Sequence, residues 1–173
     1  MPHLNLSDLS DGLPAIPRAF GQTLAEIGGL CLESQGHERG VQLRVRGYRH
    51  NTDSLEWPPV TEQDLRGFND PEEATEWGAV GVAVLLARRE IGYSVIERSR
   101  KGTGFDYWMG DESELPFERK ARLEISGIRR GANQEVNARV RQKLRQVERS
   151  GDSPAAYVIV VEFGTPRAEV REK

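Results

Sequence analysis

One continuous apolar run near the end of the chain restricts the fold more than any other feature. The run AAYVIVVEF at 155–163 is apolar at every position except Glu162, although 29% of the 173 residues are charged. Successive side chains of a strand point to opposite faces of its sheet, so such a run must be covered on both faces. It predicts a central strand of an α/β protein, with helices on both sides of the sheet.

A second apolar segment predicts the main helix. The sequence NDPEE at 69–73 supplies an Asn or Asp cap, a proline at the first helical position and carboxylates in the first turn. All three features are typical of a helix N-terminus. Residues 79–87 are apolar almost all round, which indicates burial on more than one side. We therefore expect a central helix that starts near Asp70.

The segments that follow predict the rest of this core. Good helix formers between Asn133 and Arg149 end at GDSP and predict a second helix. Three short segments with β-branched and aromatic residues lie before it and predict antiparallel neighbours, at 93–99, 104–109 and 121–128. The expected order from residue 70 is α-β-β-β-α-β, with a mixed sheet flanked by helices.

Residues 1–60 predict an N-terminal helix and strand that extend this core. Apolar residues spaced by three and four indicate a helix at 15–35, and alternation at 40–46 indicates a strand. The segment 47–59 predicts a loop or hairpin turn, because it contains breakers and two prolines. At 173 residues, the chain is expected to form a single domain with its core at 70–173.

Nothing in the sequence predicts contact with a membrane. No apolar run approaches the roughly 20 residues that span a bilayer. The N-terminus lacks the basic start and apolar stretch of a secretory signal. A cytoplasmic location is therefore expected.

Charge is unevenly distributed along the chain. Residues 61–76 contain six acidic residues and one basic residue, whereas residues 119–149 contain ten basic and three acidic residues. Within the second segment Arg141, Arg145 and Arg149 recur every four residues and form one helical stripe. The stripe would suit a DNA or RNA backbone, but it could equally face solvent, a protein partner or the acidic segment of another subunit.

Three carboxylates are the candidates for chemistry. Glu124 shares one face of its predicted strand with Arg122 and Ser126, and Asp106 lies among aromatic residues, where an unpaired carboxylate is costly. With Glu76 on the preceding helix they would form an oxygen cluster suited to Mg²⁺. Alternatively, the two strand acids form structural ion pairs with Arg98, Arg122 or Arg129, and Glu76 only complements the helix dipole.

This arrangement resembles the PD-(D/E)XK nuclease superfamily, with its restriction-endonuclease-like core. The resemblance covers residues 70 to 173 and is carried by Asp106 in GFDYW, Glu124 in LEIS and Glu76 in ATEWG. It implies that these acids are catalytic and that Asp106, Glu124 and the backbone carbonyl of Ile125 bind Mg²⁺ or Mn²⁺. A metal so placed would polarise a phosphodiester and lower the pKa of a bound water.

One position departs from the family pattern. Ser126 stands where the motif has lysine, and a hydroxyl brings no positive charge to the site. Lys101, in the turn before the second strand, is the candidate replacement, and Lys120 lies too far along its strand. The sequence therefore supports two hypotheses. The first is a nuclease-like hydrolase of DNA or RNA, weakly active or inactive, and the second is a non-catalytic protein-binding or nucleic-acid-binding module of a larger prokaryotic assembly such as a defence system.

Overall fold

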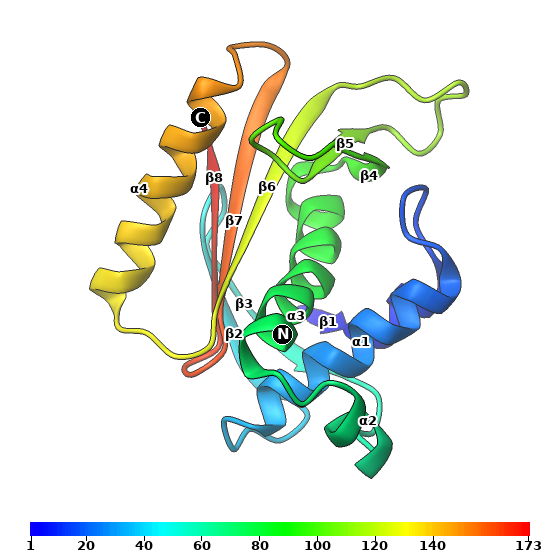
Figure 1. The fold of residues 1–173 in the computed structure, drawn as a ribbon, viewed down its shortest axis with the longest axis vertical. Coiled ribbons are helices and arrows are strands. Elements are labelled where there is room, and N and C mark those ends of the chain that lie inside the picture. The colour runs from blue at the N-terminus through cyan, green and yellow to red at the C-terminus, as the bar shows by residue number, and fades with distance from the viewer.

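The apolar run at 155–163 forms β7 (Ala155–Glu162), which lies in the middle of an eight-stranded sheet. The computed structural model describes residues 1–173 and has helices on both faces of this sheet (Figure 1). All residues of β7 after Ala155 are buried. The prediction of a central strand in an α/β protein is confirmed.

The sheet is mixed, in the order β1-β3-β2-β8-β7-β6-β5-β4. Along one half, β4 (Ser94–Arg98), β5 (Tyr107–Gly110) and β6 (Ala121–Ile128) pair antiparallel in turn, and β6 pairs parallel with β7. The other half consists of β8 (Arg167–Glu172), β2 (Val41–Gly47), β3 (Asn51–Glu56) and β1 (His3–Asn5). The N-terminal strands thus belong to the same sheet as the rest of the chain.

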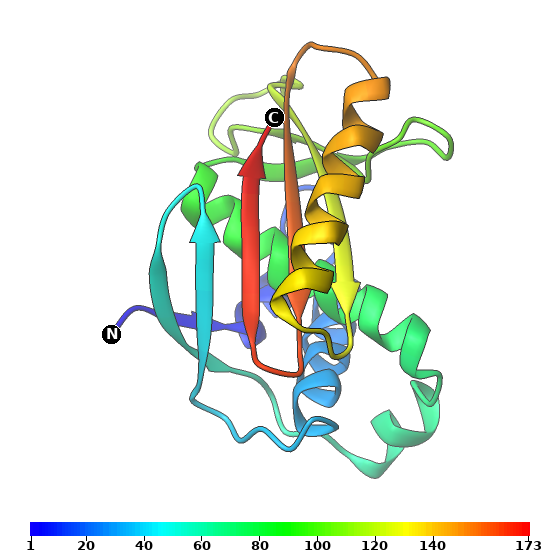
Figure 2. The ribbon, with the colours of Figure 1, turned by 90° about the vertical axis from the view of Figure 1, so that its left-hand side faces the viewer.

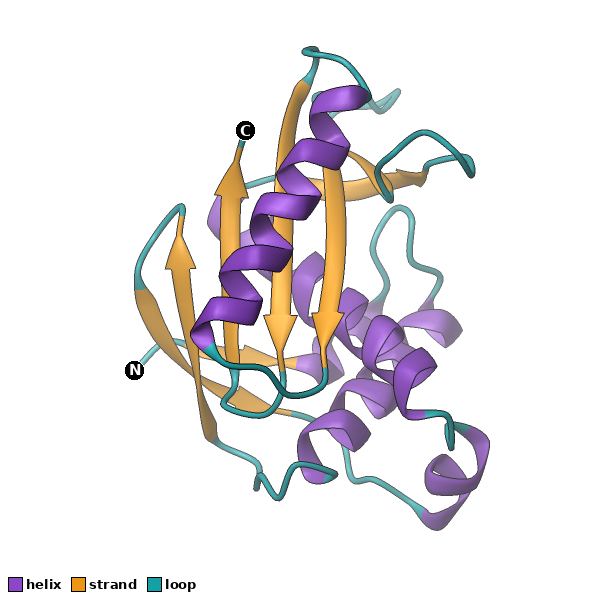
Figure 3. Cartoon of the chain, turned by 60° about the vertical axis from the view of Figure 1, so that its left-hand side comes forward, coloured by secondary structure: helices purple, strands orange, loops and turns teal.

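The helices form one layer on each face of the sheet. On one face lie α1 (Arg18–Glu33) and α3 (Pro71–Leu86), and on the other lies α4 (Asn133–Arg149), which connects the parallel strands β6 and β7 (Figures 2 and 3). The chain also has three shorter helices: η1 (Leu6–Asp11), α2 (Glu62–Gly67) and η2 (Ala87–Ile91). None of these helices combines the length and the apolar character needed to cross a membrane.

The start of α3 follows from its sequence. The carboxylate of Asp70 accepts hydrogen bonds from the backbone N–H groups of Glu72 and Glu73, at 2.9 and 3.1 Å, and Pro71 begins the helix. Further along, α3 packs closely on β6 because Gly127 has no side chain. A Cβ atom at Gly127 would lie 2.5 Å from the carbonyl oxygen of Thr75. This close approach holds α3 beside the open edge of β6.

Several elements differ from the sequence prediction. The segment predicted as a loop at 47–59 contains the strand β3, while β1, α2 and β8 were not predicted. The sequence NTDSLE of β3 lacks a clear apolar alternation because Asp53 replaces an apolar residue on its inner face, where Arg89 pairs with it at 2.6 Å. The strand predicted at 104–109 begins only at Tyr107. Asp106 therefore lies in a bend before the strand, and its predicted mid-strand position is wrong.

Candidate functional site

A pocket of about 470 Å³ opens where β5 leaves the edge of β6 uncovered. β5 pairs only with residues 121–123 of β6, so residues 124–128 have no strand on that side. The pocket, called here the carboxylate pocket, lies between α3 and α4. Its polar and charged lining residues are Glu76, Arg98, Asp106, Glu124, Ser126, Arg139, Gln142 and Lys143.

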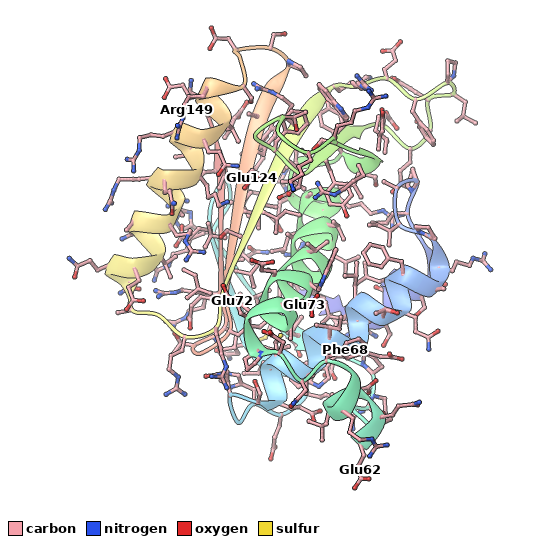
Figure 4. All side chains as sticks on the ribbon, viewed as in Figure 1. Glu62, Phe68, Glu72, Glu73, Glu124 and Arg149 are labelled. Carbon is pink, nitrogen blue, oxygen red and sulfur yellow. The ribbon has the colours of Figure 1, made fainter.

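Glu124 is held in this pocket from the side of α4. Its side chain is only 4% exposed, and its Oε1 atom accepts hydrogen bonds from Lys143 Nζ at 2.6 Å and Gln146 Nε2 at 3.1 Å. Figure 4 shows Glu124 between α4 and the strands at the edge of the sheet. The two side chains that share its face contact the same helix. Arg122 donates to Ser150 Oγ at 2.6 Å, and Arg139 donates to Ser126 Oγ at 2.7 Å.

Asp106 forms hydrogen bonds with the edge of β6 at the point where the backbone pairing with β5 ends. Its backbone N–H donates to the carbonyl of Leu123, and its Oδ2 atom accepts the N–H of Ile125, both at 2.8 Å. Arg98 lies 3.3 Å from the other carboxylate oxygen. Since residues two apart in a strand direct their carbonyls to the same side, the carbonyl of Ile125 faces the uncovered edge, as that of Leu123 faces Asp106.

The surroundings of Glu124 change its acidity. Burial, together with the nearby negative charge of Asp106, raises the pKa of Glu124 from its usual 4.5 to about 7. The hydrogen bond and the charge of Lys143 oppose this rise without cancelling it. Near neutral pH, Glu124 is therefore partly protonated, and a second cation near it would favour its charged form.

The site offers a limited set of metal ligands. Nowhere in the chain do three or more His, Cys, Asp or Glu side chains come close enough to hold a metal ion. Glu76 lines the pocket but is exposed and does not complete such a group. The oxygen donors that lie together are the carboxylates of Asp106 and Glu124 and the carbonyl of Ile125. This donor set fits Mg²⁺, which usually takes one or two protein carboxylates and keeps several waters.

The lysine at the site is one that the sequence interpretation did not select. Lys101 is exposed and does not line the pocket, and Lys120 pairs with Glu114 at 2.6 Å. Lys143 reaches Glu124 from α4 instead. The sequence did contain a sign of this arrangement, since position 143 continues the apolar stripe of Val136, Val140 and Val147. A lysine within a buried stripe needs a partner inside the protein.

The predicted arginine stripe lies elsewhere. Arg141, Arg145 and Arg149 are all exposed, and none of them lines the carboxylate pocket. Figure 4 shows Arg149 near the end of α4. On α4 the pocket is lined by Arg139, Gln142 and Lys143 instead. The structure thus separates the residues of α4 that contact the acids from those that face outward.

The chain was also compared with models of protein families, with curated proteins and with solved structures, and none of them matches it. The fold and the site geometry therefore define it as an α/β protein with a paired carboxylate site at a sheet edge.

Proposed function

We propose that the protein is a Mg²⁺- or Mn²⁺-dependent phosphodiesterase of the PD-(D/E)XK type that acts on DNA or RNA. One observation carries the proposal. The buried Glu124 lies between Asp106 and Lys143 at the uncovered edge of β6. Two adjacent carboxylates and one ammonium group are the charged parts that metal-assisted phosphodiester hydrolysis requires.

The order of elements supports the same function. From α3 to β7 the chain runs helix, three strands, helix, strand. Within this order Glu76 comes from the first helix, Asp106 from the bend directly before the second strand and Glu124 from the third strand. The resemblance to the nuclease superfamily implies the first helix and the second and third strands for its acidic residues, and Asp106 lies one residue before its strand.

Each residue of the pocket has a distinct role in this proposal. Asp106, Glu124 and the carbonyl of Ile125 would hold the metal, which supplies charge for the phosphate and lowers the pKa of a water. Lys143 provides the positive charge that Ser126 lacks, and its ammonium group can orient the attacking water or stabilise charge that develops on the phosphate. Arg98 and Arg139 line the pocket and would bind the phosphate, and Glu76 would assist from α3.

A metal titration combined with a cleavage assay tests this function. We expect Mg²⁺ or Mn²⁺ to raise the melting temperature of the protein and to support cleavage of single- or double-stranded DNA or RNA. Asp106→Ala should abolish both effects. Asp152→Asn, which removes an exposed carboxylate that does not line the pocket, is the matched control and should change neither. If neither metal stabilises the wild type and no substrate is cleaved, the enzymatic proposal is wrong.

The internal pairing of the acids favours a second candidate function. Glu124 is paired with Lys143 at 2.6 Å, and Asp106 is paired with Arg98 at 3.3 Å. A site neutralised by its own cations can be kept for stability alone. The alternative is therefore a non-catalytic module that binds nucleic acid or a protein within a larger prokaryotic assembly, such as a defence system. Nucleic-acid binding that is unchanged in Asp106→Ala, without cleavage by the wild type, would favour it.

A further inference from the structure

A second pocket, of about 550 Å³, lies at the N-terminal end of α4. It is bounded by this helix end, by the turn between β7 and β8, and by β2, which come together at the lower end of the sheet in Figures 2 and 3. We call it the arginine pocket. Its charged lining residues are Arg44, Arg46, Arg130, Arg167 and Glu162. Four cations thus face a single carboxylate.

The single carboxylate is already occupied by the protein. Glu162 is buried, and its oxygens accept N–H groups from Gly131 at 3.2 Å, Gly164 at 2.6 Å and Thr165 at 3.1 Å. These hydrogen bonds fix the β7–β8 turn against the loop before α4. Glu162 therefore fixes the shape of the pocket, and its negative charge is largely compensated by the backbone N–H groups that donate to it.

Arg167 forms the base of the pocket. Its side chain is 10% exposed and contacts the carbonyl of Gly131 at 2.9 Å, the side chain of Asn133 and, at 3.5 Å, the carboxylate of Glu162. Its Nε atom is the one that lies 3.5 Å from Glu162 Oε2, but it is buried and makes no hydrogen bond. A buried guanidinium N–H that has only such a long ion-pair contact is incompletely satisfied, because burial removes the water that would otherwise bind it.

Arg44 and Arg46 add unpaired charge at the opening. They are exposed on the face of β2 opposite Leu43 and Val45, and their side chains take part in no hydrogen bond or salt bridge of the structure. Arg44 also lies beside Arg167 in the parallel pairing of β2 with β8, whereas Arg46 lies beside Glu169, whose carboxylate pairs with Arg171 at 2.7 Å. Like charges on neighbouring strands are destabilising unless an anion lies between them.

The helix end contributes in the same direction. Ala132, the residue that precedes α4, has no side-chain oxygen to accept the N–H groups of the first turn. Glu135 is the only acidic residue in that turn, so the cations still exceed the acids around the pocket. A helix N-terminus next to several guanidinium groups favours phosphate-like anions.

We propose that the arginine pocket binds the phosphate groups of a ligand, with Arg44 and Arg46 as the direct contacts and Arg167 as the buried base. Only one of the ten lining residues is hydrophobic, which suits a highly charged ligand better than an apolar one. The phosphate can come from a free phosphorylated molecule or from a nucleic-acid backbone. The inference does not depend on the carboxylate pocket, since it rests on other residues and another kind of chemistry.

Calorimetric titration with inorganic pyrophosphate tests the site. We expect the wild type to bind pyrophosphate, and Arg44→Ala/Arg46→Ala to bind it at least about tenfold more weakly, because charge-assisted hydrogen bonds are lost. The control variant Arg141→Ala/Arg145→Ala removes equal charge from exposed positions of α4 and should bind as the wild type does. The proposal is wrong if the wild type does not bind pyrophosphate, or if both variants lose affinity equally.

The same titration separates the two sources of phosphate. A single-stranded oligonucleotide that displaces pyrophosphate from the wild type supports the pocket and identifies backbone phosphate as its ligand. Pyrophosphate binding that the oligonucleotide leaves unchanged supports the pocket as a site for a free phosphorylated molecule. The arginines replaced in the pocket variant and in the control variant are all exposed. Both variants should therefore unfold at the wild-type denaturant concentration, so weakened binding will not reflect loss of the fold.

Discussion

The two pockets beside α4 differ in how their charges are compensated. In the carboxylate pocket the buried Glu124 is paired with Lys143 and the partly exposed Asp106 is paired with Arg98. In the arginine pocket the only acid is bound by backbone N–H groups, while Arg44 and Arg46 have no partner. A ligand of the carboxylate pocket must therefore compete with internal ion pairs, whereas a ligand of the arginine pocket can bind Arg44 and Arg46 without breaking an ion pair.

The same helix serves both pockets. The valines of α4 at 136, 140 and 147 are buried against the sheet and fix the height and rotation of the helix. Its central turns then direct Lys143 to Glu124, while its first turn borders Arg167 and Glu162. Side chains on rigid elements keep their geometry better than those on loops. The difference between the pockets therefore lies in the partners, and substitutions can alter each pocket separately.

The largest effect is expected at Lys143, because its replacement removes the ion pair between α4 and Glu124 in the carboxylate pocket. Lys143→Met keeps the length of the stem and removes the charge. If the pocket is catalytic, cleavage should fall by about 10²- to 10⁴-fold, the range of a lost acid, base or charge stabiliser. Steady-state kinetics on a fluorescent oligonucleotide would measure it, with circular dichroism to verify the fold.

Lys101→Met is the matched control for this change. Lys101 is exposed in the turn before β5 and does not contact the acids, so its loss should leave the rate unchanged. A large decrease in the Lys101 variant together with a small one in the Lys143 variant would restore the interpretation drawn from the sequence alone. It would also mean that the Lys143 ion pair is only structural.

The next effect concerns stability and lies in the arginine pocket. Arg167→Met leaves Glu162 without its cation and leaves the carbonyl of Gly131 without its donor. Breaking a buried ion pair from one side is strongly destabilising, and we expect a loss of about 2 to 4 kcal/mol in the free energy of unfolding. Urea denaturation would measure it.

Arg46→Met is the comparison for Arg167→Met. Because Arg46 is exposed and unpaired, its replacement should change the free energy of unfolding by less than about 0.5 kcal/mol. Equal destabilisation by the two substitutions would contradict the assignment of Arg167 to the base of the pocket and Arg46 to its opening.

The sequence predicted the core elements because several independent features agreed for each of them. The cap at Asp70, the apolar run of β7 and the start and stop residues around α4 are all local sequence features. β3 and β8 escaped prediction because their polar residues find partners that are distant in sequence. Asp53 pairs with Arg89, and Arg167 donates to Asn133 and Gly131. Patterns of hydrophobicity cannot identify a strand whose buried positions are charged.

For the candidate site, the sequence identified the acids more completely than their partners. The strand position of Glu124 and the place of Asp106 before β5 bring both acids to one pocket, where Glu76 also lies. Lys143 was missed because its contact with Glu124 spans the crossover from β6 through α4. Charge spacing placed Arg141, Arg145 and Arg149 on one stripe of the helix and left open what that stripe contacts. The valine stripe of α4 defines the inward direction.

A smaller effect is expected from pH, through the raised pKa of Glu124. This carboxyl binds a proton more tightly in the folded protein, with a pKa of about 7, than at its usual 4.5. Its contribution to stability is therefore full below pH 4.5 and is lost as the pH rises through about 7. Relative to Glu124→Gln, the wild type should lose on the order of 1 to 3 kcal/mol of stability over this range.

Denaturation of both proteins at a series of pH values would measure this difference. Asp152→Asn should follow the wild-type curve, since that carboxylate is exposed. Added Mg²⁺ should reduce the loss near neutral pH if the ion binds the charged form of Glu124. A stability difference that does not change between acidic and neutral pH would show that Glu124 keeps an ordinary pKa.

The smallest effect is expected from the outward arginines of α4, which sharpen the contrast between open and paired charge. Arg141, Arg145 and Arg149 are exposed, and at most each would contact one phosphate of a bound strand. Replacing all three by Gln should reduce the slope of log affinity against log salt concentration by up to about 3, with a modest loss of affinity at physiological salt. Fluorescence anisotropy of a labelled oligonucleotide across salt concentrations measures the slope.

The control variant replaces three exposed arginines that lie outside α4, namely Arg18, Arg39 and Arg49. If both triple variants lower the slope equally, general positive charge attracts the strand. If only the α4 variant does so, the strand runs along the outer face of the helix that borders both pockets.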